Sequence, residues 1–337
     1  MSTQHSLSTS ASCASLAPAV PAAQPAPAAP AAQSAPVAPA ASAAQSAPIA
    51  PAASAHAGLA VSSNADSDSY AQLVLRIGYR GGDFSGWAFQ PGVRSVEGEL
   101  TRALETFLRR PCALVCAGRT DAGVHAHAQY VSLGISEAEA ALSREKIMRA
   151  LSALTPDDIS IRSIYRADPS FSARFSATSR SYCYRIALGS IKPVLTAGYV
   201  WHASHIPHVC MDDMNEAAQA LLGEHDFTSF CKKVSAERLK EDGLSLSRRL
   251  TKLCVARDYV LGEQILRIDV EGNAFLHNMV RIIVGSLMEV GRGQRDTRWL
   301  SEVLEARARG RAAMTAPAKG LVLEQVTYPA FSLSPWE

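Results

Sequence analysis

Residues 116–126 read Cys116-Ala117-Gly118-Arg119-Thr120-Asp121-Ala122-Gly123-Val124-His125-Ala126, with an apolar run before them and a mixed run after them. This pattern predicts a strand, a tight loop and a second strand. Gly118 and Gly123 allow the loop backbone to take positive φ angles or to approach a partner closely. We therefore expect Asp121 to be presented at the end of a strand rather than buried.

The chemistry of this loop depends on the charge of Asp121. Arg119 stands two positions earlier, and in so short a loop its guanidinium can lie near the carboxylate and favour the charged form. An ionised carboxylate can act as a nucleophile or as a base. The alternative interpretation is an Asx-turn, in which Asp121 hydrogen-bonds its own backbone and Arg119 is a solvated neighbour.

The first 68 residues differ in composition from the rest of the chain. They consist mainly of Ala, Pro, Ser and Gln and contain no Lys or Arg. Because such a segment has too few apolar branched and aromatic side chains to build a core, we expect residues 1–68 to be a disordered tail. Neither a secretory signal, a mitochondrial presequence nor a membrane span is recognisable, so we expect a cytoplasmic protein without a membrane segment.

Charge and cysteine content limit the possible partners and compartments. After residue 69 the chain has 33 basic and 29 acidic residues, a net charge of +4, since Asp66 and Asp68 are the only charged residues before that point. This excess is too small to indicate a nucleic-acid partner, so any RNA-binding surface must come from local clustering. The seven cysteines are scattered without a Cys-x-x-Cys pair, a pattern typical of a reduced intracellular protein.

Hydrophobic periodicity divides residues 69–170 into strands and helices. Alternation over 73–79 predicts a strand, Ser95 is a good N-cap for a helix that ends near 109–111, and a capping-box pattern begins at Ser136 before a helix that ends near Pro156. Strands are also expected at 129–133 and 159–164. The order strand, helix, strand, strand, helix, strand indicates an α+β domain with mixed pairing.

The second half of the chain shows a similar alternation. Strands are expected at 181–186, 250–259, 265–270 and from 319 onward, and helices at 214–222 and 296–311. Tyr182 and Tyr184 lie on one face of the first of these strands, where tyrosines more often belong to a core than to a catalytic site. The segment 232–249 is the densest basic stretch, and it is either a solvated loop or an RNA-contacting arm.

One charged residue stands out in an apolar segment. Beyond Phe275, the run up to Met288 is apolar on nearly every side, which predicts a buried helix, and Arg281 is its only cation. A lone charge in a buried helix is costly unless an acid pairs with it or a polar cleft opens to it. Arg281 is therefore a candidate site residue.

Two groups of histidines could suggest a metal site. His202, His205 and His208 have regular spacing, but Pro207 prevents one helix from presenting all three, and no cysteine or carboxylate cluster follows at ligand spacing. His125 and His127 lie near Asp121, but nothing nearby in the sequence completes a triad. We expect no metal at either group.

The run around Asp121 resembles the signature loop of the tRNA pseudouridine synthase A family. Further runs match the family in the same order, over about residues 71–330: Gly86-Trp87, the segment 173–178 with the strand after it, 226–230, 273–288 and Gly320-Leu321. The chain departs from the family pattern at Ala88-Phe89, at Cys231 and in the long basic segment that follows Cys231.

The resemblance implies both a fold and an activity. The implied fold has two similar α+β domains, 69–170 and 171–337, with mostly antiparallel sheets joined in one pseudouridine-synthase platform and helices on the outside. The implied protein is a homodimer without a cofactor, and its cleft spans both subunits. It converts uridine to pseudouridine at positions 38, 39 and 40 of the tRNA anticodon stem-loop.

The resemblance also assigns roles to individual residues. Asp121 is the implied catalytic residue, with Arg119 and Arg281 beside it. Tyr182 would stack on the target base, and Leu321 would form an apolar wall of the base pocket. Stacking of this kind contributes about 1–3 kcal/mol per base, enough to hold a flipped uracil.

Two other functions compete with this interpretation. The departures from the family pattern would fit an RNA-binding protein with this fold and no turnover, although the presence of Asp121, Arg119, Tyr182 and Arg281 argues against it. A metal-dependent hydrolase using His125, His127 and Asp121 is the second alternative.

Overall fold

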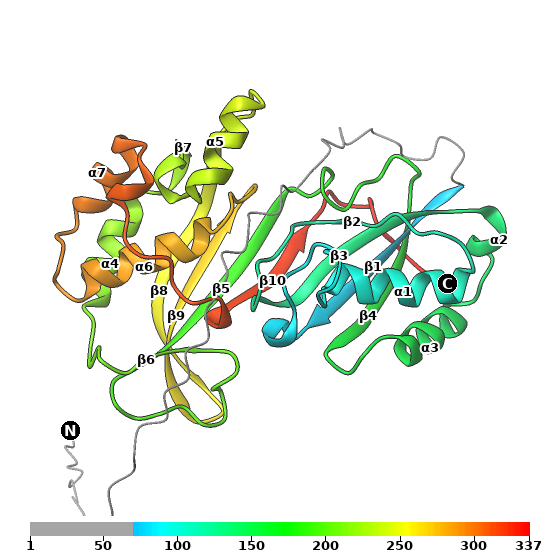
Figure 1. Cartoon of the computed structure of the whole chain (residues 1–337), viewed down its shortest axis with the longest axis horizontal. Helices are drawn as coiled ribbons and strands as arrows, with labels where there is room; N and C mark the ends of the chain where they lie inside the picture. The colour runs from blue at the N-terminus through cyan, green and yellow to red at the C-terminus, as the bar shows by residue number, and fades with distance from the viewer. Residues whose placement is uncertain (1–69) are drawn as a thin grey trace, which may run out of the picture. The chain divides into compact units, whose positions relative to one another are not determined.

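One mixed β-sheet runs through residues 70–337, the part of the chain that the computed structural model describes. The expected tail at residues 1–68 lies outside the described residues. The strand order is β11-β4-β1-β3-β10-β5-β9-β8-β7, with β2 beside β3 and β6 beside β5 (Figure 1). The strands are β1 (Ala71–Tyr79), β2 (Val115–Cys116), β3 (His125–Ile135), β4 (Ile159–Ala167), β5 (Ser179–Leu188), β6 (Trp201–Ala203), β7 (Gly223–Asp226), β8 (Ser247–Val260), β9 (Glu263–Gly272), β10 (Leu321–Thr327) and β11 (Ser334–Pro335).

Helices cover one face of this sheet. Side chains from each of them join the inward-facing strand residues in one continuous apolar core, as the expected strand and helix periodicities require. The helices are α1 (Val96–Leu108), α2 (Glu137–Ala140), α3 (Arg144–Leu154), α4 (Met211–Gln219), α5 (Lys233–Glu241), α6 (Met279–Gly291) and α7 (Trp299–Ala306).

Strand β10 joins the two halves of the sheet. It pairs antiparallel with β5 from the second half and parallel with β3 from the first half, where its partners are His125 and Ala126. Most other neighbours are antiparallel, so the expectation of an α+β protein with mostly antiparallel pairing is confirmed. Near the end of the chain, β11 pairs with β4 of the first half.

Several expected helices differ from the structure at their ends: the buried one begins at Met279, and the one expected at 214–222 is Met211–Gln219. The capping box of Ser136 is formed, but its helix stops at Ala140, and Ser143 caps a separate helix, α3. The helix expected at 296–311 covers only Trp299–Ala306, because Arg307 takes a left-handed φ of 45° that ends it.

The long basic segment contains a helix of its own. Helix α5 occupies Lys233–Glu241, where two i,i+4 ion pairs stabilise the helical conformation: Lys233–Glu237 and Arg238–Asp242, both at 3.9 Å. Ala236 is its only buried residue. The sequence alternatives of a solvated loop or an RNA-contacting arm did not include a helix.

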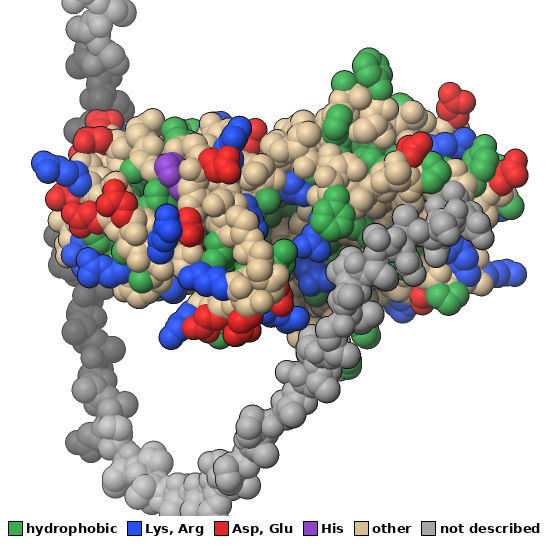
Figure 2. All heavy atoms as spheres, turned by 90° about the horizontal axis from the view of Figure 1, so that it is seen from above, with side chains coloured by type: hydrophobic (Ala, Val, Ile, Leu, Met, Phe, Trp, Pro, Cys, Tyr) green, Lys and Arg blue, Asp and Glu red, His purple; other side chains and the backbone are tan. Residues whose placement is uncertain are grey.

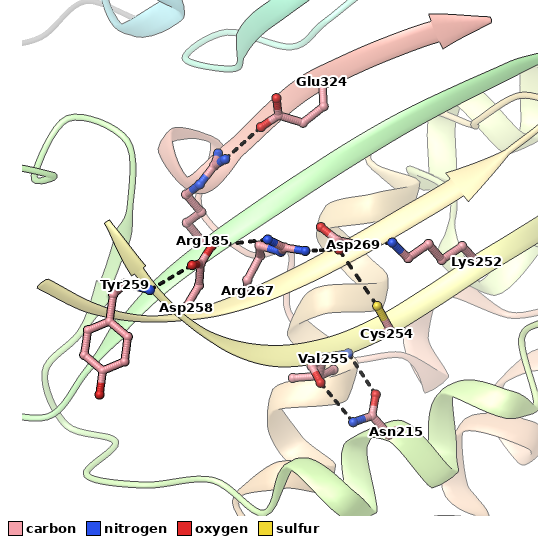
Figure 3. Close-up of polar contacts among 10 residues, drawn as sticks. All are labelled: Arg185, Asn215, Lys252, Cys254, Val255, Asp258, Tyr259, Arg267, Asp269 and Glu324. Carbon is pink, nitrogen blue, oxygen red and sulfur yellow. Dashed lines mark hydrogen bonds and ion pairs between the residues drawn. The ribbon is translucent and has the colours of Figure 1, made fainter. Parts of the chain in front are cut away.

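Ion pairs cross the sheet face opposite the helices in the second half (Figure 3). Arg267 contacts Asp258 at 3.3 Å and Asp269 at 2.8 Å, and the neighbouring Arg185 contacts Glu324 at 2.8 Å. Arg185 and Arg267 face each other across β5 and β9, so the carboxylates offset the repulsion between them. On the helix side, Asn215 of α4 exchanges two hydrogen bonds with the backbone of Val255.

The charge distribution on the surface and the state of the cysteines agree with what the amino-acid composition predicts. Figure 2 shows acidic and basic side chains interspersed on one face of the molecule, in keeping with the small net charge. The cysteines of the described part are free thiols. Between residues 70 and 337, no helix combines the length and apolarity that crossing a membrane requires.

Candidate active site

Asp121 lies in the loop between β2 and β3, and 27% of its side chain is exposed. Its carbonyl accepts a hydrogen bond from the Val124 N–H at 3.2 Å, which closes a turn. Among the described residues, its carboxylate accepts a hydrogen bond from Arg281, lies 3.3 Å from the His277 ring, and is bonded to none of the loop's own backbone amides. The Asx-turn alternative is therefore wrong, and the carboxylate is directed at the second half of the chain.

Arg281 holds one carboxylate oxygen. Its Nη1 lies 3.0 Å from Asp121 Oδ2 and 3.0 Å from Asn278 Oδ1, and its Nε donates to the Ala316 carbonyl at 2.8 Å. Three bonds to separate groups fix the plane of the guanidinium. The lone cation of the buried helix thus has the acidic partner that its burial requires.

His277 holds the other oxygen, and sequence reasoning did not select it. Its Nε2 lies 3.3 Å from Asp121 Oδ1, while its Nδ1 lies 2.8 Å from Ser235 Oγ in α5. In the sequence His277 precedes Arg281 by four residues, which is helical spacing within the run expected to form the buried helix. That spacing was the signal in the sequence that could have identified it. The structure places His277 in the turn before α6, where Asn278 takes a left-handed φ of 64°.

Arg119 does not have the expected position beside the carboxylate. It is exposed, and within residues 70–337 it forms no ion pair with Asp121. The loop directs Asp121 toward α6, and Arg281 supplies the guanidinium in place of Arg119.

Tyr182 lies next to the Asp121 loop. Its ring is buried and packs edge-on against Phe275, with centroids 5.1 Å apart, and a Cβ added at Gly118 would lie 3.8 Å from its hydroxyl. Burial raises the pKa of Tyr182, nearby Arg180 lowers it, and the negative charge of Asp121 raises it further. Tyr182 is thus a neutral hydroxyl within electrostatic range of Asp121.

Leu321 is the first residue of β10 and is buried. It pairs with Tyr184, while Leu323 pairs with Tyr182, so all four side chains lie on one face of the sheet. The absence of a side chain at Gly320 lets the backbone before β10 lie close to the Tyr184 ring, since a Cβ there would be 2.7 Å from that ring. The buried apolar packing therefore continues from Tyr182 along β10.

A glycine-rich turn supports the Asp121 loop from beneath. A Cβ at Gly81 would lie only 1.9 Å from the Val124 carbonyl, and Gly86, at a φ of +103°, lies against the Thr120 carbonyl. Trp87 donates its backbone N–H to the same carbonyl at 3.0 Å. Its ring is almost fully buried, so this aromatic belongs to the core beneath the loop and is not available to a base.

Arg180 fixes the loop from the other side. This buried cation donates to the carbonyls of Ala117, Arg174, Ala177 and Asn273, at distances from 2.6 to 3.3 Å. Burial lowers its pKa. By satisfying its donors with backbone carbonyls, Arg180 ties the start of the Asp121 loop to the connector before β5 and to the turn after β9.

The histidines considered as metal ligands have other contacts. His125 Nδ1 accepts a hydrogen bond from the Gly81 N–H at 3.1 Å, and His202 Nε2 lies 2.9 Å from the Gly189 carbonyl. In the part of the chain that the structure describes, no three His, Cys, Asp or Glu side chains are grouped so that they could hold a metal ion.

A family model and individual relatives both match this chain to the same kind of protein. A family model described as tRNA pseudouridine synthase matches residues 217–329. The chain is 39% identical to tRNA pseudouridine synthase A of Streptomyces griseus over 275 residues, which cover 80% of this chain and 93% of the relative. It is 40% identical to the proteins of that name from Geobacillus sp. and Aeromonas hydrophila, over 76% and 77% of this chain and 98% and 91% of those relatives.

Proposed function

The chain belongs to the tRNA pseudouridine synthase A family and is an isomerase that converts uridine in tRNA to pseudouridine, and we propose that Asp121 is the carboxylate that carries out this reaction. The observation that supports this role most directly is the ion pair at 3.0 Å between Asp121 and Arg281. It holds a partly exposed carboxylate in one orientation beside Tyr182. A positioned acceptor of this kind suits attack on a ribose or removal of one of its protons.

The reaction requires few groups. The bond between ribose C1′ and uracil N1 breaks, the base turns, a bond forms between C1′ and C5, and the proton leaves C5 for N1 or solvent. Asp121 acts on the ribose as a nucleophile or as a base, and both roles need a free lone pair on one carboxylate oxygen. Arg281 keeps the other oxygen occupied.

The surrounding residues hold the substrate in this proposal. Tyr182 contacts the target base and Leu321 extends the apolar wall of the pocket, because both lie on the same face of adjacent strands. Arg119 is exposed two residues from Asp121 and makes no ion pair within residues 70–337, so its guanidinium can contact RNA. The target uridines in this proposal are positions 38, 39 and 40 of the anticodon stem-loop.

We also propose the larger organisation that the family suggests. Residues 69–170 and 171–337 form two domains, and the site lies where they join. In this division Asp121 and Arg119 come from the first part, and Tyr182, Arg281 and Leu321 come from the second. The protein acts on tRNA in the cytoplasm as a homodimer.

The test is the substitution Asp121→Asn, which keeps the shape of the side chain and removes its charge. Single-turnover formation of pseudouridine is measured with saturating enzyme, beside a binding curve for the same tRNA. We expect product formation to be abolished and tRNA affinity to change little, since phosphate contacts and RNA shape dominate binding. Asp157→Asn, an exposed carboxylate in a turn, is the matched control.

Near-normal turnover in Asp121→Asn would refute the catalytic assignment. Loss of product with unchanged binding, while Asp157→Asn behaves as wild type, would support it and would contradict an RNA-binding protein without turnover.

A further inference from the structure

We propose that His277 is a positioning residue for the Asp121 carboxylate and that Ser235, in helix α5, fixes the orientation of His277. The inference rests on the proposed role of Asp121. It assigns the two carboxylate oxygens different tasks and connects the catalytic loop to the most basic segment of the chain.

The two oxygens of Asp121 have unequal partners. Oδ2 is held by Arg281, whose side chain is only 17% exposed and which has two further hydrogen bonds. Oδ1 is held by His277 at the longer distance of 3.3 Å, and that side chain is 40% exposed. Oδ2 is therefore the anchored oxygen, and Oδ1 is the one that a substrate entering from solvent reaches, with His277 setting its direction.

Both ring nitrogens of His277 are occupied, which determines its tautomer. An ionised carboxylate only accepts hydrogen bonds, so in this proposal His277 carries its proton on Nε2, the nitrogen that lies 3.3 Å from Asp121 Oδ1. In the neutral ring Nδ1 is then an acceptor, and the Ser235 hydroxyl at 2.8 Å donates to it. Ser235 thereby fixes both the tautomer and the rotation of the ring.

The backbone around His277 is fixed independently of its imidazole. Leu276 and Met279 are buried on either side, and the Lys232 N–H donates to the His277 carbonyl at 3.0 Å. Removing the imidazole therefore leaves the core and the start of α6 intact. The contact with Asp121 is what the side chain adds.

The contact with Ser235 makes α5 part of the site. Helix α5 packs on the core through Ala236 and the half-buried Leu239, and the contacts of Lys232 and Ser235 tie its start to His277. The same helix carries Lys233, Arg238 and Lys240 on exposed positions. Phosphate contacts that immobilise α5 would thus also steady His277 and, through it, Oδ1 of Asp121.

The experiment compares His277→Ala, His277→Gln, Ser235→Ala and the double variant in single-turnover reactions with saturating enzyme. Val234→Ala, an exposed neighbour of Ser235 on α5, is the matched control. We expect His277→Ala to lower the rate about 10- to 100-fold, the effect of losing a hydrogen bond to a charged group. His277→Gln should keep most of the wild-type rate, since the glutamine amide can donate a hydrogen bond to Asp121 Oδ1.

Ser235→Ala should lower the rate about threefold in the wild-type background, as expected for one neutral hydrogen bond. It should have no further effect when His277 is already Ala, because Ser235 acts through that ring. The affinity of every variant for tRNA should stay within about twofold of the wild-type value. The loss of activity then appears in the reaction rate of the enzyme–tRNA complex.

A full rate in His277→Ala, or a variant with Gln as slow as that with Ala, would overturn the proposal. Additive effects of the Ser235 and His277 substitutions would also overturn it. Asp121→Asn separates this inference from the proposed function: if that variant turns over normally, the catalytic assignment itself fails, whereas a dead Asp121→Asn beside a fully active His277→Ala refutes only the role of His277.

Discussion

Asp121 and Arg281 are 160 positions apart in the chain, and their side chains meet with 3.0 Å between Oδ2 and Nη1. The acid comes from a loop that leads into β3, and the cation comes from the first turn of α6. Strand β10 makes the meeting possible, because it lies between β3 and β5 and brings the two halves of the sheet together. Several substitutions test what this arrangement does.

Arg281→Lys keeps the charge but not the fork of donors. A lysine cannot bind Asp121, Asn278 and the Ala316 carbonyl with the same geometry, so the carboxylate loses its fixed orientation. We expect a single-turnover rate about 100-fold lower with nearly unchanged tRNA affinity. Arg292→Lys, just beyond the other end of α6, is the control, and equal rates in the two variants would contradict the role of Arg281.

Arg180→Lys should destabilise the fold around the Asp121 loop. Lysine has three donors on one nitrogen and cannot reach four separate carbonyls, so at least one carbonyl loses its donor. We expect the free energy of unfolding to fall by about 3 kcal/mol in urea titrations. Arg149→Lys, at an exposed position of α3, should change the free energy of unfolding by less than about 0.5 kcal/mol. An equal effect at both positions would contradict the role of Arg180 in holding the loop.

Gly81→Ala and Gly82→Ala form a matched pair of neighbouring substitutions. A Cβ at residue 81 would lie 1.9 Å from the Val124 carbonyl, whereas a Cβ at residue 82 meets nothing within 4 Å. Alanine at 81 should therefore lower the free energy of unfolding by about 1–3 kcal/mol and displace the end of the Asp121 loop, while alanine at 82 should be tolerated. Urea unfolding and turnover of both variants check this, and indistinguishable behaviour would show that the turn is not packed beneath the loop.

Glu263→Gln should remove a pH-dependent contribution to stability. The Glu263 carboxylate accepts from the Thr196 hydroxyl and from the backbone N–H groups of Val194, Leu195 and Thr196, and these bonds lower its pKa from 4.5 to about 2. Because the pKa is depressed in the folded state, the contribution is complete above 4.5 and is lost as the pH falls toward 2.

Thermal unfolding of wild type and Glu263→Gln across that range is the measurement. The wild type should be the more stable protein at neutral pH, and the difference should shrink below pH 4.5. Glu145→Gln, at an exposed position of α3, should show no such trend. A difference that is the same at every pH would mean that the charge of Glu263 is not responsible.

The basic residues of α5 should contribute to tRNA binding through their charge. Replacing Lys233, Arg238 and Lys240 with Gln removes three cations from one exposed helix. Binding should weaken more at about 50 mM salt than at about 200 mM, because fewer counterions are released. Lys146→Gln with Arg149→Gln on α3 is a control for net charge, and equal weakening at both salt concentrations would indicate a folding defect instead.

Local elements and the candidate residues within them could be predicted from the order of amino acids alone. Alternation of apolar residues identified β1, β5, β8 and β9, and the Ser95 and Ser136 caps located helix starts, because these signals depend on neighbouring residues. The single charge in the apolar run identified Arg281 without knowledge of its partner. The departures from expectation lie where contacts with distant segments, or the conformation of one residue such as Arg307, decide the end of an element.

Which groups meet at Asp121 depends on how distant segments pack together. Arg119 is near in sequence and yet unpaired with the acid, while Arg281 and His277 are far away and contact it. The reason is that the loop's direction is set by the turn beneath it, by Arg180, and by the position of β10 between β3 and β5. Periodicity in a sequence reports which face of an element is buried, but which strands become neighbours follows from how all the buried faces pack together.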